Sequence, residues 1–245
     1  MADTIHAEPV TYTAGDTTLR GYLATDTTKE GKRPAVLVVH EWWGLNDYIR
    51  RRARMLAELG YRALAVDMYG DGKVADNPGD AGALMNGVLG DMKAGEARFR
   101  AGYDLLASRA DVDRNRIAAI GYCFGGAVVL HAARLGWPLR GVVSFHGALG
   151  SLHKPPPGSV QAKILVCHGA VDSLVPEADV TAFKQEMDHA KADYRFVAYP
   201  KALHGFTNPD ATANGKRYGF PLGYDAEADR RSWQDMTEFL ARVLA

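Results

Sequence analysis

Two kinds of hydrophobic segment alternate along the chain. Short apolar runs rich in β-branched residues occur at residues 35–40, 63–67, 117–120, 139–145, 164–168 and 195–199. Segments with apolar positions three or four residues apart occur at residues 48–59, 94–108, 127–135, 177–190 and 226–244. The first pattern is typical of buried strands, and the second is typical of helices with one buried face. Strands that alternate with helices predict an α/β fold, with a mostly parallel central sheet flanked by helices on both faces.

Two regions of the chain differ from this alternation. Residues 10–13 and 19–24 alternate apolar and polar positions, and they predict two more strands. Residues 68–93 are rich in Gly, Asp and Asn and have only a weak apolar pattern at 83–89. We expect a loop with a short helix there, bordering a pocket. A length of 245 residues with 47% hydrophobic content suits one large core, so we predict a single domain over residues 1–245.

Composition and charge exclude several classes of protein. The chain has 29 basic and 29 acidic residues and no basic stripe, so we expect no binding to nucleic acid. The first residues are polar and no apolar run is long enough to span a bilayer, so we expect neither a signal peptide nor a membrane protein. The two cysteines, Cys123 and Cys167, make no disulfide framework, although one bridge between them is an alternative. These features predict a cytoplasmic monomer or small homo-oligomer with reduced thiols.

Cys123 lies where an apolar run meets a helical pattern. The residues around it read Gly-Tyr-Cys-Phe-Gly-Gly at 121–126, which is the G-x-S-x-G pattern of a nucleophile elbow with cysteine in place of serine. Gly121 and Gly125 are required because a Cβ at either position would clash with neighbouring backbone. A helix that begins behind the sulfur favours the thiolate. We therefore predict that Cys123 is a nucleophile.

A cysteine nucleophile needs a base and a group that orients the base. In hydrolases with such an elbow, the order along the chain is nucleophile, acid, histidine. Asp172 follows the apolar run 164–168, and His204 follows the last apolar run. We predict that Asp172 accepts a hydrogen bond from one ring nitrogen of His204 and that the other nitrogen faces the thiol. The alternatives are that Asp172 caps the helix at 177–190, although Pro176 fits the start of that helix better, and that His204 is an ordinary loop residue.

A further candidate segment, His-Glu-Trp-Trp-Gly at 40–44, follows an early strand. Hydrolases of this type supply the second amide of the oxyanion hole at this position, so we predict N–H donors from Trp42 and Phe124. Glu41 beside them is unusual because an ionised carboxylate is costly next to an oxyanion. We infer that Glu41 holds the S–H of the cysteine or receives its proton. The alternative is an ion pair of Glu41 with Arg50 or Arg51.

These motifs resemble those of the dienelactone hydrolase family. The matching segments are 40–44, 121–126, Gly-Ala-Val-Asp at 169–172 and Leu-His-Gly-Phe at 203–206, and the resemblance extends from about residue 8 to the C-terminus. It implies an α/β-hydrolase fold and the hydrolysis of dienelactone, a cyclic enol ester of chlorocatechol breakdown. It also implies a catalytic triad of Cys123, His204 and Asp172, with Glu41 engaging the resting thiol.

The sequence departs from the family at the substrate. The well-known members bind the substrate carboxylate with arginines, one shortly after the histidine and one after the fourth strand. Residues 205–209 contain no arginine, and Lys73 is the only cation near the second position. A lysine does not replace a bidentate arginine equally, so the resemblance leaves the substrate open. The predicted substrate contacts are Tyr69, which matches a pocket tyrosine of the family, and Trp43, Phe145 and His146.

The combined features predict a cysteine-dependent hydrolase of lactones or carboxylic esters that forms a thioester intermediate. One alternative is the same triad acting on a different acyl or haloacyl substrate. Another is a binding or redox-sensing protein whose exposed thiol reacts without turnover. The sequence contains no nucleotide-binding motif and no convincing metal-ligand spacing, so we expect no metal and no cofactor.

Overall fold

The chain divides into two compact units at a point inside one strand. The computed structural model describes residues 4–151 and 153–245. The N-terminal unit extends to Ala119, and the C-terminal unit comprises Ile120–Ala245. β5 (Val112–Tyr122) begins in the first unit and ends in the second. The single domain over residues 1–245 stays a prediction.

The strands of the N-terminal unit follow the order β1-β2-β4-β3-β5. The first four are β1 (Ile5–Ala14), β2 (Thr17–Asp26), β3 (Arg33–Val39) and β4 (Arg62–Val66). β3 and β4 are parallel, whereas β1 pairs antiparallel with β2 and β2 antiparallel with β4. Residues 35–39 and 63–66 are fully buried, which explains why their sequences are continuous apolar runs and do not alternate.

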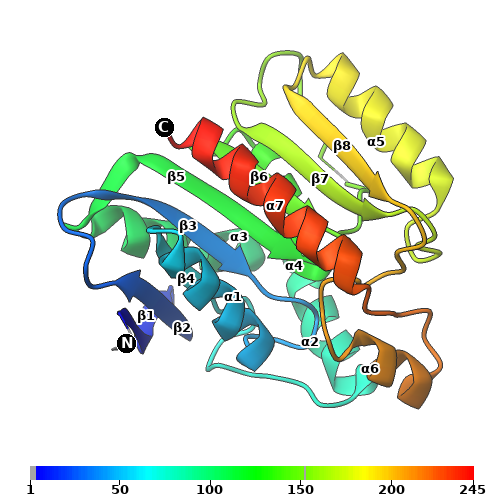
Figure 1. Cartoon of the computed structure of the whole chain (residues 1–245), viewed down its shortest axis with the longest axis horizontal. Coiled ribbons are helices and arrows are strands. Elements are labelled where there is room, and N and C mark those ends of the chain that lie inside the picture. The colour runs from blue at the N-terminus through cyan, green and yellow to red at the C-terminus, as the bar shows by residue number, and fades with distance from the viewer. Residues whose placement is uncertain (1–3, 152) are drawn as a thin grey trace. The chain divides into compact units, whose positions relative to one another are not determined.

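Helices cover the strands of the N-terminal unit. They are α1 (Asp47–Glu58), α2 (Pro78–Gly90) and α3 (Met92–Ser108). α1 packs against β2, β3 and β4, and α3 packs against β1, β3 and β4 from the other side (Figure 1). α1 begins after Asn46, whose side chain accepts a hydrogen bond from the backbone N–H of Ile49. This cap fixes the end of the 40–46 loop.

The region 68–93 contains more helix than its weak apolar pattern indicates. α2 spans 13 residues and α3 already starts at Met92. Only Ala81 and Val88 of α2 are buried, so no apolar stripe marks the helix in the sequence. Its start is set instead by Asn77, which caps the backbone N–H of Asp80, and by a proline in the first turn.

The strands of the C-terminal unit follow the order β5-β6-β7-β8. Its remaining elements are α4 (Phe124–Arg134), β6 (Gly141–Phe145), β7 (Lys163–Gly169), α5 (Glu177–His189), β8 (Tyr194–Tyr199), α6 (Ala211–Tyr218) and α7 (Ala226–Val243). β6, β7 and β8 are parallel and pair without a register shift. The carboxyl ends of these strands therefore meet at one edge, where an α/β protein binds its ligands.

α4 and α7 cover opposite faces of β6. A Cβ added to Gly141 would lie 2.9 Å from the ring of Phe239 in α7. The hydroxyl of Ser144, an odd number of residues further along the strand, lies against Gly126 in α4. Side chains an odd number of residues apart point to opposite faces of a strand. The parallel strands with helices on both faces confirm the predicted fold class.

One helix of the C-terminal unit was not expected from the sequence. α6 has eight residues and ends at Gly219, which takes the left-handed conformation with φ 73°.

Within residues 4–151 and 153–245, no helix combines the length and apolar character needed to cross a membrane. In the same ranges, no group of three or more His, Cys, Asp or Glu side chains could hold a metal ion. The cytoplasmic location and the monomer or small homo-oligomer stay predictions.

Candidate active site

Cys123 occupies the single position between β5 and α4. Its φ is 53° and its ψ is −114°, a conformation that costs a non-glycine residue about 1–3 kcal/mol. The surrounding structure holds it there: the Cys123 N–H donates to the carbonyl of Phe145 at 2.9 Å, and the Cys123 carbonyl accepts from Ala127 N–H at 3.2 Å. At this bend Cys123 is a partly exposed residue at the N-terminus of α4.

The elbow requires close backbone approaches on both sides of the cysteine. A Cβ at Gly121 would overlap the carbonyl group of Gly125, and a Cβ at Gly126 would lie 2.6 Å from Ser144 Oγ and 2.8 Å from the Cα of Gly147. The requirement for glycine at position 121 was predicted from the sequence. The requirement at position 126 was not, because it depends on the end of β6.

The structure brings Cys123, His204 and Asp172 together within the C-terminal unit. His204 Nε2 lies 3.1 Å from Cys123 Sγ, and His204 Nδ1 lies 2.8 Å from Asp172 Oδ2. An ionised carboxylate only accepts, so Nδ1 carries a proton and Nε2 is left to exchange a proton with the sulfur. Asp172 does not cap α5, whose N-cap is Pro176. Its other oxygen accepts from the Leu174 N–H at 2.9 Å.

The neighbours of His204 favour its charged form. Burial alone lowers the pKa of His204, but the charge of Cys123 and the hydrogen bond to Asp172 outweigh it and raise this pKa to about 10. His204 is therefore an imidazolium at neutral pH. The Asp172 side chain is fully buried, so water does not weaken its electrostatic interaction with His204.

A short segment before α7 holds the histidine loop in place. The Gly223 N–H donates to the carbonyl of His204, and the Asp225 N–H donates to the carbonyl of Phe206, both at 3.1 Å. His204 also forms an isolated bridge with Leu222. We call residues 222–225 the strap. The strap could not be predicted from the amino-acid sequence, because its contacts are made by backbone atoms.

Phe145 and His146 pack behind the site. Phe145 is buried and stacks on the ring of Tyr122 at 4.7 Å. His146 is buried too: its Nε2 lies 2.7 Å from Thr207 Oγ1, and its ring centroid lies 5.2 Å from that of His204. In this position His146 touches the catalytic candidate itself. A contact of either residue with substrate stays a prediction.

Exposed apolar side chains surround the Asp172 turn and the strap. They are Val171, Leu174, Phe220 and Tyr224, between 37% and 52% exposed. Large apolar side chains in water are informative when they gather near a site. These residues could not be identified from the sequence, because exposure cannot be read from residue type.

Phe124, the first residue of α4, belongs to the C-terminal unit. The remaining candidate residues belong to the N-terminal unit, in and beside the 40–46 loop. Glu41 and Trp43 are buried, with 4% and 7% exposed, and the rings of Trp42 and Trp43 lie 4.9 Å apart. Tyr69 is buried and donates its hydroxyl to the backbone carbonyl of Trp42 at 2.9 Å. Tyr69 therefore holds the loop. Its contact with substrate stays a prediction, as does that of Trp43.

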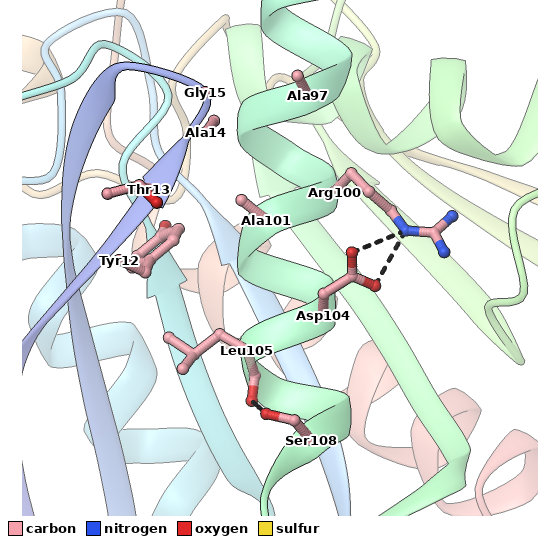
Figure 2. Close-up of a pocket in the computed structure, with 10 residues that line it drawn as sticks. All are labelled: Tyr12, Thr13, Ala14, Gly15, Ala97, Arg100, Ala101, Asp104, Leu105 and Ser108. Atoms are coloured by element: carbon pink, nitrogen blue, oxygen red, sulfur yellow. Dashed lines mark hydrogen bonds and ion pairs between the residues drawn. The ribbon is translucent and has the colours of Figure 1, made fainter.

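A surface hollow of about 500 Å³ in the N-terminal unit contains none of the candidate residues. It lies between the end of β1 and α3 (Figure 2). Its charged side chains pair with each other: Arg100 Nε donates to both carboxylate oxygens of Asp104, at 3.0 and 3.2 Å. Both partners are about half exposed, so this ion pair contributes little to the stability of the fold. The hollow offers no nucleophile with a base.

Comparison with known proteins agrees with the fold. A family model described as the dienelactone hydrolase family matches residues 19–244. A putative carboxymethylenebutenolidase of Salmonella typhimurium is 28% identical over 232 residues, covering 90% of this chain and 82% of the relative.

Two solved structures are similar over nearly the whole chain. One is a dienelactone hydrolase-like promiscuous phosphotriesterase from metagenomic libraries, with a TM-score of 0.92 and 38% identity over 99% of this chain and 100% of the other. The second is a putative dienelactone hydrolase from Klebsiella pneumoniae, with a TM-score of 0.79 and 27% identity over 98% of this chain and 99% of the other. The chain is therefore a hydrolase with the α/β-hydrolase fold, and it belongs to the dienelactone hydrolase family.

Proposed function

We propose that this hydrolase cleaves lactones and activated carboxylic esters through a thioester on Cys123. The observation that carries the proposal is the pair of contacts from Asp172 through His204 to the sulfur, at 2.8 and 3.1 Å. This arrangement supplies a nucleophile, a base and a group that orients the base. The positive φ of Cys123 supports the same role, because strained backbone gathers at functional sites.

In the first half of the reaction, the Cys123 thiolate attacks the carbonyl carbon of the substrate. A C–S bond forms, and the carbonyl electrons move onto oxygen. When the tetrahedral intermediate collapses, the C–O bond of the leaving group breaks and the alkoxide or enolate takes the proton from His204 Nε2. The product is a thioester and a neutral imidazole, still oriented by Asp172 through Nδ1.

In the second half, the neutral His204 takes a proton from water, and the hydroxide adds to the thioester carbonyl. The C–S bond breaks, which releases the carboxylic acid product and restores the thiolate beside an imidazolium. The thiolate is a good leaving group, so the thioester is hydrolysed readily. Formation of the thioester therefore limits the rate when the substrate alcohol is a poor leaving group. Enol lactones and aryl esters are therefore the preferred substrates.

We propose that the amide N–H groups of Trp42 and Phe124 bind the oxyanion and that Glu41 engages the resting thiol. Phe124 is the first residue of α4, where N–H groups point toward a negative charge. Trp42 lies in a loop whose backbone is held by Tyr69. Loss of one oxyanion donor typically lowers kcat by about 10²- to 10³-fold.

The residues after the histidine favour a neutral substrate. Residues 205–209 contain no arginine, and Phe206, Thr207 and Asn208 are buried, so this stretch offers no charged group to a carboxylate. The exposed apolar side chains near Asp172 also favour an uncharged substrate. We propose that uncharged lactones and esters are better substrates than anionic ones such as dienelactone.

The proposal is tested by replacing each cysteine in turn. We expect Cys123→Ala to lower kcat for p-nitrophenyl acetate at least about a thousandfold, as removal of a nucleophile does in triad enzymes. Cys167→Ala, the matched control, should keep wild-type kcat within about twofold, because Cys167 is buried. Full activity of Cys123→Ala would reject the triad. Comparing dienelactone with a neutral lactone then tests the preferred charge.

A second candidate activity is the hydrolysis of neutral phosphotriesters. The similar solved structure at 38% identity is titled a promiscuous phosphotriesterase, and a thiolate beside an oxyanion hole can attack phosphorus as well as carbon. A phosphotriester with a p-nitrophenolate leaving group tests it. We expect turnover that Cys123→Ala abolishes, whereas turnover that survives this change would exclude the triad as its source.

A further inference from the structure

His40 is a buried histidine that the proposed mechanism does not use. It follows β3 directly and is 0% exposed. Both ring nitrogens have partners in the N-terminal unit. Nδ1 lies 2.5 Å from the carbonyl oxygen of Glu41, and Nε2 lies 3.2 Å from the backbone nitrogen of Met68.

These partners determine which nitrogen of His40 carries the proton. The Met68 N–H can only donate, so Nε2 must be the unprotonated nitrogen. The Glu41 carbonyl can only accept, so Nδ1 must carry the hydrogen. Burial lowers the pKa of His40 to about 4, although the Glu41 carbonyl and the charge of Asp67 act against it. The ring is therefore neutral at pH 7 and donates to the Glu41 carbonyl.

The Glu41 carbonyl and the Trp42 N–H belong to the same peptide group. In a trans peptide these two bonds point in opposite directions, so a donor that holds the carbonyl also fixes the direction of the N–H. The Glu41 carbonyl accepts a second bond, from the Gly44 N–H at 3.2 Å. Two donors on one carbonyl polarise the amide and strengthen its N–H as a donor.

Tyr69 holds the next peptide group in the same way. Its hydroxyl donates to the Trp42 carbonyl at 2.9 Å, and its ring packs edge-on against the His40 ring, with centroids 4.7 Å apart. Tyr69 is held in turn by Asp67, whose Oδ1 accepts from the Tyr69 N–H at 2.9 Å. The backbone on both sides of Trp42 is thus tied to the end of β4.

We propose that His40 and Tyr69 are positioning residues that clamp the two peptide groups around Trp42 and aim the Trp42 N–H at the substrate oxyanion. The proposal rests on the proposed function, because it assumes that this N–H is an oxyanion donor. It assigns Tyr69 to the loop instead of the substrate. It also explains why a buried, neutral histidine precedes Glu41.

The test uses a pair of variants that separate the two hydrogen bonds of His40. In His40→Gln, the side-chain amide reaches the former Nε2 position, so the bond to Met68 can form and the donor to Glu41 is lost. In His40→Asn, the amide N–H replaces Nδ1–H and keeps that donor. We expect His40→Gln to lower the acylation rate for p-nitrophenyl acetate about tenfold to a hundredfold, less than complete loss of an oxyanion donor. His40→Asn should stay within about fivefold of wild type.

Alkylation of Cys123 by iodoacetamide separates positioning from general damage. This reaction uses the thiolate but forms no oxyanion, so its rate should match wild type in His40→Gln. Unchanged acylation in this variant would overturn the proposal, and so would an alkylation rate that falls as far as acylation. If His40→Gln does not fold, Tyr69→Phe decides: we expect slower acylation with normal alkylation, and wild-type acylation would overturn the proposal. Full activity of Cys123→Ala would instead reject the proposed function itself.

Discussion

The two cysteines of the C-terminal unit occupy opposite environments. Cys123 lies in a bend with positive φ at the start of a helix, partly exposed, with His204 at 3.1 Å. Cys167 lies inside β7, fully buried, with the Tyr199 hydroxyl at 3.5 Å. Burial raises the pKa of Cys167 to about 12, so it stays a neutral thiol. Both are free cysteines, so no bridge joins them.

The comparison shows that backbone shape and neighbouring charge determine what a thiol can do. Cys167 is buried inside a strand, and this burial favours the uncharged form. The elbow gives Cys123 a cation, access to solvent and the N-terminus of α4. A cysteine in the elbow is therefore reactive, whereas a cysteine inside the strand only fills space in the core.

Selective alkylation provides the largest expected contrast. In the native protein, iodoacetamide should modify Cys123 at least about a thousandfold faster than Cys167, because only thiolate reacts. His204→Gln should slow the reaction of Cys123 at least about tenfold and leave Cys167 inert. Peptide mass analysis over time measures both rates. Similar alkylation rates for the two cysteines in the native protein would contradict the comparison. As a control, the two rates should be similar in guanidinium, where the unfolded chain gives both cysteines the same surroundings.

The pH dependence of turnover should report the charge on His204. Since its pKa in the folded enzyme is about 10, above the ordinary value of 6.5, the imidazolium persists at neutral pH and is lost as the pH rises through 10. The stability that the charged His204 contributes to the fold is complete below pH 6.5 and is lost as the pH rises through 10.

We therefore expect kcat/KM for an alkyl ester, whose alkoxide must be protonated, to fall about tenfold between pH 9.5 and 11. A p-nitrophenyl ester should lose much less, because its leaving group departs without a proton. Parallel profiles for the two esters would contradict this role for His204.

The same substitution at both cysteines gives the smallest and most specific contrast. Cys167→Ser should destabilise the protein by about 1–2 kcal/mol, because a hydroxyl is costlier to bury than a thiol, and it should leave kcat unchanged. Cys123→Ser should lower kcat strongly and shift stability by less than about 0.5 kcal/mol. Urea unfolding and ester turnover measure the two effects. A loss of activity in folded Cys167→Ser would show that the two sites are coupled.

Much of the candidate site could be predicted because its signals are local in the sequence. The elbow needs glycine at 121 for a steric reason that any chain obeys, and the structure shows that overlap. Asp172 follows the buried strand β7 and His204 follows β8, and parallel strands bring their ends to one edge. The His204 side chain contacts Cys123 and the Asp172 side chain contacts His204, while their catalytic roles remain our proposal.

What could not be predicted depends on contacts between distant segments. The bond from Tyr69 to the Trp42 carbonyl joins the ends of two strands, and residue type alone indicates a pocket tyrosine equally well. The helix α2 carries little apolar pattern because most of its surface is exposed. The strap is held by backbone atoms, which every residue has.

The strap links α7 to the loop that carries His204. The same residues that fix the His204 and Phe206 carbonyls lead directly into α7. α7 also packs on β6, where Phe239 and Val243 lie against Gly141. A displacement of α7, from a fused domain or a surface tether, would therefore reach both the strand and the loop that carries the imidazole. An engineer who wants to regulate this enzyme by force or by a bound partner could attach the lever to α7, and one who wants it undisturbed should leave a long flexible linker there.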